Sequence, residues 1–185
     1  MAQSSSADTV VKDSRSILKG QDCPICRKKT LALSMTESDV PFFGKILIYT
    51  MFCDSCKYHK ADVESDEQKK PCRFTFEVKN KDDLNVRVVK SADAVVKIPH
   101  IGSIMPGPNA EGYVTNVEGL IVKIKDQVET IKDTEEDEAL KKKAKNLLKK
   151  IQNIIWGSEK AKIIIEDKTG NSAIISDNAV KEELK

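Results

Sequence analysis

Histidine, tryptophan and recognisable catalytic patterns are scarce in this sequence. Its 185 residues include two histidines and one tryptophan, so acid–base chemistry through imidazole has few candidates. Neither the phosphate-binding pattern GxxxxGK[ST] nor the nucleophile pattern GxSxG occurs. We therefore expect a protein that is not an enzyme.

Long hydrophobic runs are absent as well. Apolar runs such as residues 46–48 and 163–165 are far shorter than the roughly 20 residues that a membrane helix needs. The opening MAQSSSADTVV lacks the basic region and apolar core of a secretory signal. We expect a cytoplasmic protein with no membrane attachment, in which thiols stay reduced.

Neither sign of charge dominates. Thirty-one basic residues oppose 29 acidic ones, which leaves a net charge of +2 although 32% of the residues are charged. Basic residues are not interleaved with aromatic ones, which argues against nucleic acid as a partner. The local exception is a lysine-rich stretch that consists of Lys141, Lys142, Lys143, Lys145, Lys149 and Lys150.

Two closely spaced cysteine pairs are the strongest positive signal. Cys23 and Cys26 form one C-x2-C pair, and Cys53 and Cys56 form another after 26 intervening residues. In a reducing compartment this spacing is typical of metal ligands, and four thiolates favour zinc, with a four-thiolate iron site as the minor alternative. Because four sulfur ligands leave no position for a reactive water, we expect one structural Zn²⁺.

The remaining cysteine and the histidines lie outside this pattern. Cys72 begins an alternating strand, which favours a buried thiol over a fifth ligand. His59 follows Cys56 by three residues and could replace a sulfur, but the four cysteines already satisfy the metal. His100 follows a proline in a turn and is expected at the surface; a cupin-type enzyme would need a His/Glu cluster around it.

Hydrophobic patterning divides the chain into three parts. Residues 1–20 are serine-rich and polar, which predicts a disordered tail. Residues 21–62 contain two predicted strands, at residues 31–36 and 45–52. Each lies beside a cysteine pair, which is the layout of a zinc ribbon. Residues 63–185 form the larger domain. Its predicted strands lie at residues 72–78, 85–89, 95–98, 161–166 and 172–176, the last two joined by a hairpin turn.

A helical hairpin is predicted within the larger domain, at about residues 115–156. Apolar residues at three- and four-residue steps predict a first helix, which begins at a capping box between Thr115 and Glu118. Asp133 or Thr134 is expected to cap a second helix with an acidic first turn and lysine-rich later turns. The fold class is therefore mainly β with α (α+β).

Several motifs, in one order, resemble the ZPR-type zinc-finger family. They are CPIC, VPFFGKILIYTMFCDSC, CRFTFEV, VVKSADAVVKIP, EGYVTNVEGL and GNSAII, and they cover residues 22 to about 178. The chain resembles the single-unit form found in archaea rather than the tandem eukaryotic form. The resemblance implies a zinc finger followed by a double-stranded β-helix, a jelly-roll-like domain that carries the helical hairpin.

The same resemblance implies a function. It implies non-catalytic zinc and binding of translation elongation factor 1-alpha, for whose folding eukaryotic members act as a chaperone. We expect a monomeric zinc-binding adaptor or chaperone; the alternative is a nucleic-acid-binding zinc ribbon protein that uses the lysine-rich helix. The chain departs from the family by placing Arg27 and Lys57, instead of glycine, after each cysteine pair, where the knuckle favours a left-handed backbone.

Five residues are candidates for partner contact: Phe42, Phe43, Arg73, Lys90 and Glu118. The two phenylalanines follow a proline in the hairpin loop, where adjacent aromatic side chains are not easily both buried. Solvated strand positions are the alternative for Arg73 and Lys90. Helix capping is the alternative for Glu118, and a simple turn is the expectation for residues 170–172.

Overall fold

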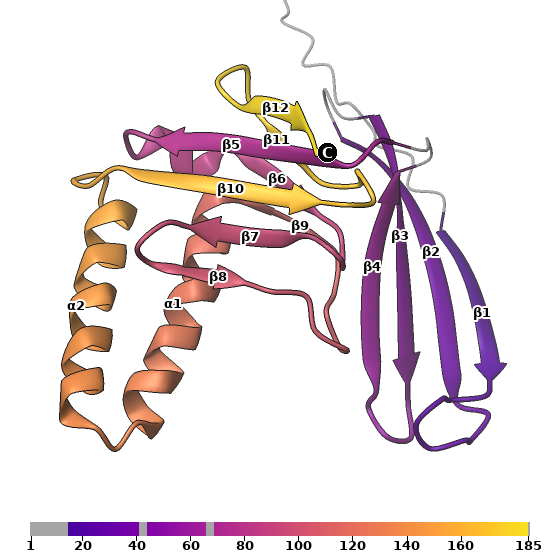
Figure 1. Cartoon of the computed structure of the whole chain (residues 1–185). Helices are drawn as coiled ribbons and strands as arrows, with labels where there is room; N and C mark the ends of the chain where they lie inside the picture. The colour runs from indigo at the N-terminus through magenta and orange to yellow at the C-terminus, as the bar shows by residue number, and fades with distance from the viewer. Residues whose placement is uncertain (1–14, 41–43, 66–68, 185) are drawn as a thin grey trace, which may run out of the picture.

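A computed structural model describes residues 15–40, 44–65 and 69–184 of the chain. A four-stranded sheet stands beside a larger module of strands and two helices (Figure 1). The partner candidates Phe42 and Phe43 lie outside the described residues.

The N-terminal sheet is antiparallel, with the strand order β1-β2-β3-β4. Its strands are β1 (Arg15–Gln21), β2 (Leu31–Val40), β3 (Gly44–Cys53) and β4 (His59–Ser65). The two predicted strands are confirmed and are longer than expected. The tail prediction is wrong for residues 15–20, because β1 pairs with β2 there. β1 is an edge strand on which Ile17 and Leu18 are exposed. Because neither face of β1 is buried, its sequence lacks the alternation of apolar and polar residues that predicts a strand.

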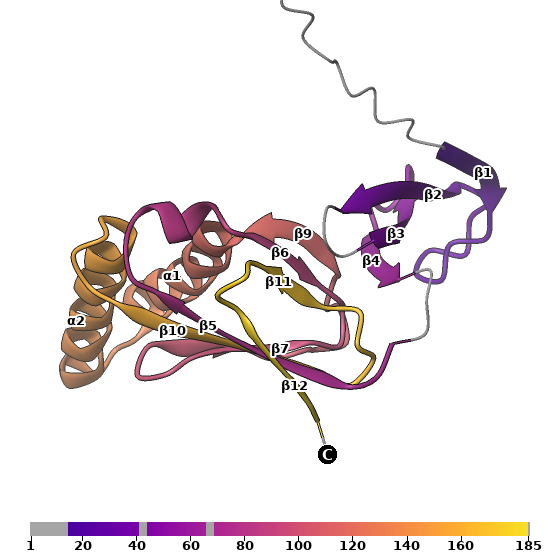
Figure 2. The ribbon, with the colours of Figure 1, turned by 90° about the horizontal axis from the view of Figure 1, so that it is seen from above.

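The larger module is a jelly roll built from two antiparallel sheets. The five-stranded sheet has the order β12-β5-β10-β7-β8, and the three-stranded sheet has the order β11-β6-β9. Seen from above, β6, β9 and β11 lie on the opposite side of the module from β5, β7 and β10 (Figure 2). The strands are β5 (Cys72–Val78), β6 (Arg87–Lys90), β7 (Val95–Ile98), β8 (Gly102–Ile104), β9 (Tyr113–Asn116), β10 (Ala161–Asp167), β11 (Ala173–Ile175) and β12 (Val180–Glu183).

One prediction about the strand connections is wrong. The strands β10 and β11 do not pair with each other: β10 pairs with β5 and β7, whereas β11 pairs with β6. The predicted hairpin turn is therefore a crossover from one sheet to the other. Local turn chemistry cannot distinguish the two outcomes, because each requires only a tight change of direction.

One hydrophobic core joins both sheets to the helices. Phe76 and Ile163 of the large sheet, Val88 of the small sheet and Leu120 of the first helix are each at most 1% exposed and belong to one cluster. Full burial of such side chains contributes about 1.5–3 kcal/mol each. None of the four predicted cysteine ligands belongs to this core.

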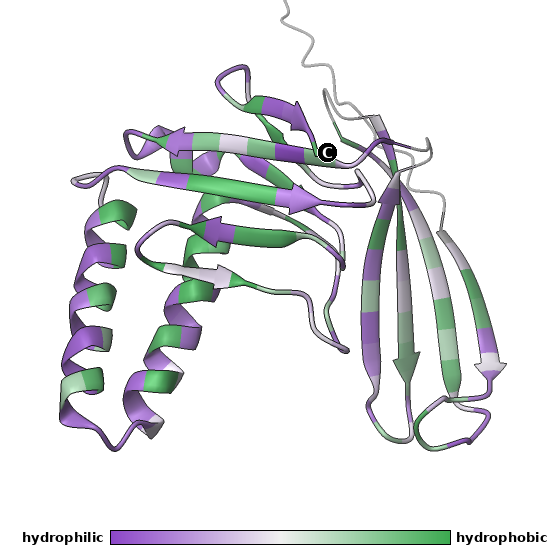
Figure 3. Cartoon of the chain, viewed as in Figure 1, coloured by the Kyte–Doolittle hydropathy of each residue, from purple (hydrophilic) through white to green (hydrophobic). Residues whose placement is uncertain are grey.

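The two helices form the predicted hairpin. They are α1 (Val117–Thr134) and α2 (Glu138–Ile155), and the apolar stripe of α2 faces α1 (Figure 3). A short 3₁₀ helix, η1 (Asp82–Asn85), precedes β6. Among the helices in the described part of the chain, none has both the length and the apolar character that a membrane crossing requires.

Both predicted helix caps are wrong. Asn116, not Thr115, caps α1: its side-chain oxygen accepts a 2.8 Å hydrogen bond from the backbone N–H of Gly119. Thr115 instead belongs to β9, opposite Val88. Because α1 continues through Thr134, the cap of α2 moves to Asp137, whose carboxylate accepts from two backbone N–H groups of the first turn.

The N-terminal sheet packs against one end of the jelly roll. Val40, Ile46 and Val63 of the sheet form a buried cluster with Val89 of β6. Polar contacts cross the same junction: the backbone N–H of Gly112 donates to the carbonyl of Ala61 (3.1 Å), the N–H of Ser65 to the Asn171 side chain (3.1 Å), and the N–H of Ala92 to Asp62 (3.0 Å). We refer to the N-terminal sheet together with its two cysteine pairs as the zinc module. Both apolar and polar contacts therefore hold the zinc module against the jelly roll.

Candidate metal centre

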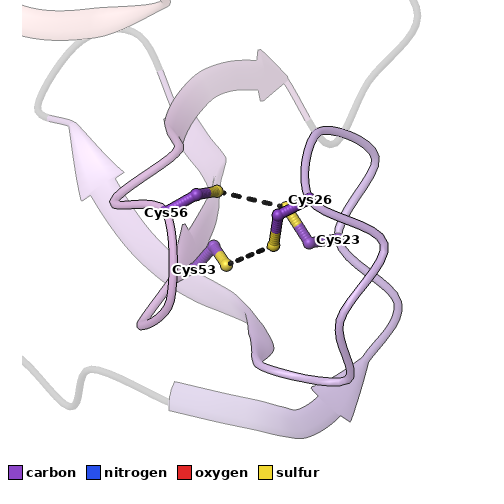
Figure 4. Close-up of side chains that lie close together, drawn as sticks. All are labelled: Cys23, Cys26, Cys53 and Cys56. Atoms are coloured by element: carbon purple, nitrogen blue, oxygen red, sulfur yellow. Dashed lines mark hydrogen bonds between the residues drawn. The ribbon is translucent and has the colours of Figure 1, made fainter.

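The four predicted cysteine ligands converge at one end of the N-terminal sheet. The Sγ atoms of Cys23 and Cys56 lie 3.6 Å apart, those of Cys26 and Cys53 lie 3.7 Å apart, and all four lie within 4.8 Å of one another (Figure 4). A zinc ion with four Zn–S bonds of about 2.3 Å requires a tetrahedron with edges of about 3.8 Å. The sulfur positions therefore fit one tetrahedral zinc ion.

Two tight knuckles create this geometry. In the first, the backbone N–H of Arg27 donates to the carbonyl of Cys23 (2.9 Å); in the second, the N–H of Lys57 donates to the carbonyl of Cys53 (2.9 Å). Arg27 and Lys57 have φ angles of 59° and 61°. The expected left-handed backbone is confirmed, and it costs about 1 kcal/mol for a residue with a side chain.

The electrostatics of the sulfur cluster favour a bound cation. The hydrogen bond from the Thr30 hydroxyl, 3.2 Å from Cys53 Sγ, is the main cause that lowers the pKa of Cys53 to about 6. A backbone hydrogen bond from Tyr58 lowers the pKa of Cys56, but burial and the three other sulfurs outweigh it and raise that pKa to about 12. Four thiolates at this spacing repel one another unless a cation binds them, as Zn²⁺ does.

The site is structural in character. Cys23 and Cys53 are at most 1% exposed and pack with Leu31 in a small apolar cluster. Four sulfur ligands complete the tetrahedral coordination of zinc, which leaves no position for an activated water. The zinc therefore stabilises the N-terminal sheet, whose own apolar clusters are small.

Neither Cys72 nor either histidine belongs to the sulfur cluster. Cys72 is buried in β5, and its Sγ lies 3.8 Å from the carbonyl oxygen of Ser172. His59 Nδ1 lies 2.9 Å from a carboxylate oxygen of Glu111 in the jelly roll. The buried position predicted for Cys72 is confirmed.

Arg73, a candidate for partner contact, is engaged within the chain. Its Nε and Nη2 atoms donate to the Glu166 carboxylate at 2.9 Å and 2.7 Å, and Lys97 Nζ donates to the other carboxylate oxygen at 2.7 Å. Hydrogen bonds and charge from Lys97 and Arg73 outweigh burial and lower the pKa of Glu166. These contacts link three neighbouring strands of the large sheet, and a partner contact of Arg73 stays a prediction.

The other two described candidates differ in burial. The solvated strand position, the alternative expected for Lys90, is wrong, because Lys90 is only 2% exposed and points into the protein; its contact with a partner stays a prediction. Glu118 lies half-buried in the first turn of α1, where the helix dipole favours a negative charge. Because Asn116 caps the helix, Glu118 is not part of the predicted capping box, and its contact with a partner stays a prediction.

Sequence reasoning missed a buried polar cluster around Asp167. One of its carboxylate oxygens accepts from the Ser91 and Ser172 hydroxyls (2.8 Å and 2.5 Å), and the other accepts from the N–H and hydroxyl of Thr169 (2.7 Å and 2.6 Å). Burial opposes ionisation, yet these hydrogen bonds outweigh it and lower the pKa of Asp167. The sequence predicted a turn at residues 167–172, but a turn pattern does not indicate that Asp167 is fully buried.

The turn between β10 and β11 requires a glycine at position 170. Gly170 has a φ of +74°, and a Cβ there would clash with the carbonyl oxygen of Lys70. The neighbouring Asn171 accepts the hydrogen bond from Ser65 described above. The residues expected to form a simple turn therefore also join the zinc module to the jelly roll.

Comparisons with known proteins agree with this two-module structure. A family model of the ZPR1 zinc-finger domain matches residues 17–71, and a family model of the ZPR1 jelly-roll domain matches residues 82–185. A ZPR1-like protein of Methanocaldococcus jannaschii is 39% identical over 165 residues, 88% of this chain and 83% of that protein.

Other relatives match over shorter segments. A ZPR1-like protein of Pyrococcus horikoshii is 37% identical over 97 residues, 51% of this chain and 44% of that protein. The zinc finger chaperone zpr1 of Schizosaccharomyces pombe is 36% identical over 88 residues, 46% of this chain and 19% of that protein. On the two domain matches and the M. jannaschii similarity together, the chain belongs to the ZPR1 family of zinc-finger proteins.

Proposed function

We propose that this protein is a zinc-stabilised adaptor or chaperone without catalytic activity, and that it binds translation elongation factor 1-alpha as a monomer. The observation that carries the proposal is family membership over both modules. The S. pombe relative is named a zinc finger chaperone, and the elongation factor is the partner that the resemblance of the sequence motifs implies.

The zinc module offers a surface suited to such a partner. A hollow of about 500 Å³ on its sheet is lined in part by Ile17, Ala32 and Phe52, with Lys19 and Lys29 beside them. Ile17 and Phe52 are 49% and 38% exposed. Exposed apolar side chains bordered by charged ones are typical of protein-binding surfaces and of chaperone contacts with incompletely folded chains.

A refolding assay tests the proposal. Denatured elongation factor 1-alpha is diluted into buffer with or without the zinc-loaded protein, and the recovery of nucleotide binding is measured. We expect the wild type to raise the yield and Cys53→Ser, which removes a zinc ligand, to lose this effect. Cys72→Ala is the matched control, because Cys72 is a buried cysteine outside the sulfur cluster. A yield no higher than with an unrelated zinc protein would contradict the proposal.

One observation favours the alternative function, nucleic-acid binding. Lys142, Lys143, Lys145 and Lys149 of α2 are exposed and form no ion pair with the described residues. If this lysine face binds RNA, the affinity must fall steeply as salt rises, because bound phosphates release counterions. A weak or salt-independent interaction in a filter-binding assay would exclude this alternative.

A further inference from the structure

A cavity of about 520 Å³ lies between the end of β8, the loop of residues 105–112 and α1. Ile104, Met105 and Pro108 are among its apolar lining residues, and Lys90, Tyr113 and Lys123, whose side chains carry hydrogen-bond donors, line it as well. We refer to this cavity as the Lys90 pocket. It lies in the jelly roll, apart from the zinc site.

The ammonium group of Lys90 is buried, and no carboxylate of the described residues forms an ion pair with it. Lys90 is 2% exposed, and within the described part of the chain its Nζ donates one hydrogen bond, 2.9 Å to the carbonyl of Ser91. An ammonium group has three N–H donors, so two lack a protein acceptor there. Burial lowers the pKa of Lys90, while Asp167, Asp62 and Asp93 act on it only from beyond ion-pair distance and oppose that shift.

The hydroxyl of Tyr113 is a second unsatisfied donor at the same place. Of the buried side-chain nitrogen and oxygen atoms in residues 15–40, 44–65 and 69–184, it is the one without a hydrogen-bond partner. Lys90 Nζ and Lys123 Nζ lie 5.5 Å and 4.5 Å from the centre of the Tyr113 ring. Two lysines therefore approach a tyrosine whose hydroxyl has no acceptor, and leaving such a group unpaired is costly.

We propose that the Lys90 pocket binds one carboxylate, supplied by an acidic side chain of the partner protein. The pocket's unsatisfied groups are donors, and a carboxylate oxygen accepts from both an ammonium and a hydroxyl. Asp126 and Glu111 also line the cavity, so its charge suits a single carboxylate better than the phosphates of a nucleic acid. This inference rests on the proposed function for the identity of the partner, but not for the chemistry of the pocket.

The pocket itself is tested with a small probe. N-acetyl-glutamate amide, which carries one side-chain carboxylate, is titrated into the zinc-loaded full chain while NMR shifts of the Tyr113 and Lys90 signals are recorded. N-acetyl-glutamine amide is the uncharged control, and inorganic phosphate is a second anion. We expect saturable shifts with the glutamate probe alone. Absence of shifts, equal shifts with the glutamine compound, or tighter binding of phosphate would each overturn the assignment of a carboxylate site.

Variants of the pocket test whether the partner uses it. Tyr113→Phe removes only a hydroxyl that has no partner, so the melting temperature should not fall, whereas the Kd for elongation factor 1-alpha should rise about tenfold. Lys123→Gln, at an exposed position, should also weaken binding. Lys125→Gln is the control: Lys125 lies on the same helix, about 200° around the axis from Lys123, and pairs with Glu129.

The two proposals fail in different ways. If the elongation factor does not bind the wild type at all, the proposed function is wrong, and the probe titration still decides whether the pocket takes a carboxylate. The other outcome is that the elongation factor binds the wild type but binds Tyr113→Phe and Lys123→Gln as tightly as the control Lys125→Gln. In that case the partner does not use the Lys90 pocket, and the inference is wrong.

Discussion

Arg27 and Lys57 each complete a zinc knuckle in a backbone conformation that residues with side chains rarely adopt. Their φ angles are 59° and 61°, and each costs about 1 kcal/mol relative to glycine. Zinc binding contributes on the order of 10 kcal/mol in small metal-dependent modules. The metal thus stabilises a local conformation that the residue itself disfavours.

Glycine at one of these positions should stabilise the protein. For Arg27→Gly we expect the free energy of unfolding of the zinc-loaded protein to rise by about 0.5–1 kcal/mol, because the Cβ clash disappears while the unfolded chain gains some entropy. Urea unfolding at saturating zinc measures the change. Lys28→Gly is the control and should lower stability, because the φ angle of Lys28 is not positive. A loss of stability in Arg27→Gly would contradict the strain argument.

Asp167 is the residue on which we expect the jelly roll to depend most strongly. It is fully buried and accepts four hydrogen bonds. Asp167→Asn replaces half of the acceptor atoms by a donor, so hydroxyls now face an N–H group. We expect the free energy of unfolding at neutral pH to fall by about 2 kcal/mol. Asp177→Asn, in the exposed loop before β12, is the control and should change it little.

The effect of Asp167→Asn should depend on pH. Hydrogen bonds lower the pKa of Asp167 in the folded state, so its charge stabilises the protein above the unfolded pKa of roughly 3.9 and this contribution is lost as pH falls further. The stability difference between wild type and variant should therefore shrink below about pH 4. Comparing the two proteins at each pH cancels the acid loss of zinc that both share. A constant difference would contradict the role of the carboxylate charge.

At the scale of elements, the start of α1 decides how the helical hairpin leaves the small sheet. The strand β9 and α1 are contiguous, so Asn116 ends the strand and caps the helix at once. Its extended backbone suits the strand, and its side-chain oxygen accepts from the first turn of the helix. The edge strand β9 of the small sheet and the first helix of the hairpin are therefore joined without a loop.

Substitutions at this junction distinguish the observed cap from the predicted capping box. Asn116→Ala should lower the free energy of unfolding by about 1 kcal/mol, whereas Asn116→Asp should retain most of the stability. Glu118→Ala should cost less than about 0.5 kcal/mol, the usual limit for a position outside a cap. Chemical denaturation measures all three variants. A larger loss for Glu118→Ala than for Asn116→Ala would favour the capping box.

At the scale of the whole molecule, the two modules differ in what stabilises them. The buried clusters of the N-terminal sheet are small, whereas one extensive core unites both sheets and both helices of the jelly roll. A module of about 50 residues with little core needs a metal to stay folded. Zinc removal should therefore act on one module first.

Chelation should unfold the N-terminal sheet and leave the jelly roll folded. We expect hydrogen exchange with a strong chelator to show loss of protection in β1–β4 and retained protection in β5, β10 and α1. Metal analysis before chelation should give one zinc per chain. Unfolding of the whole chain in a single step would show that the junction at Val63 and Val89 couples the modules more tightly than their separate cores suggest.

Much of this architecture could be predicted because it follows from local patterns. Two C-x2-C pairs bring thiolates to one ion by short-range backbone geometry, so the zinc site needed only the spacing of Cys23, Cys26, Cys53 and Cys56. The strands β5 and β7 agree with the predicted ranges because each alternates between a buried and an exposed face. The helical hairpin was predictable from the period of its apolar residues.

The sequence by itself determined the ligand set, the strand-forming segments and the helical hairpin, because spacing and periodicity are properties of neighbouring residues. Only the tertiary structure decided that β10 and β11 join different sheets, that Asp167 lies buried among hydroxyls, and that Lys90 points inward toward Tyr113. Each of these depends on which distant segments pack together. Burial and hydrogen-bond partners follow from that packing, which no single stretch of the chain encodes.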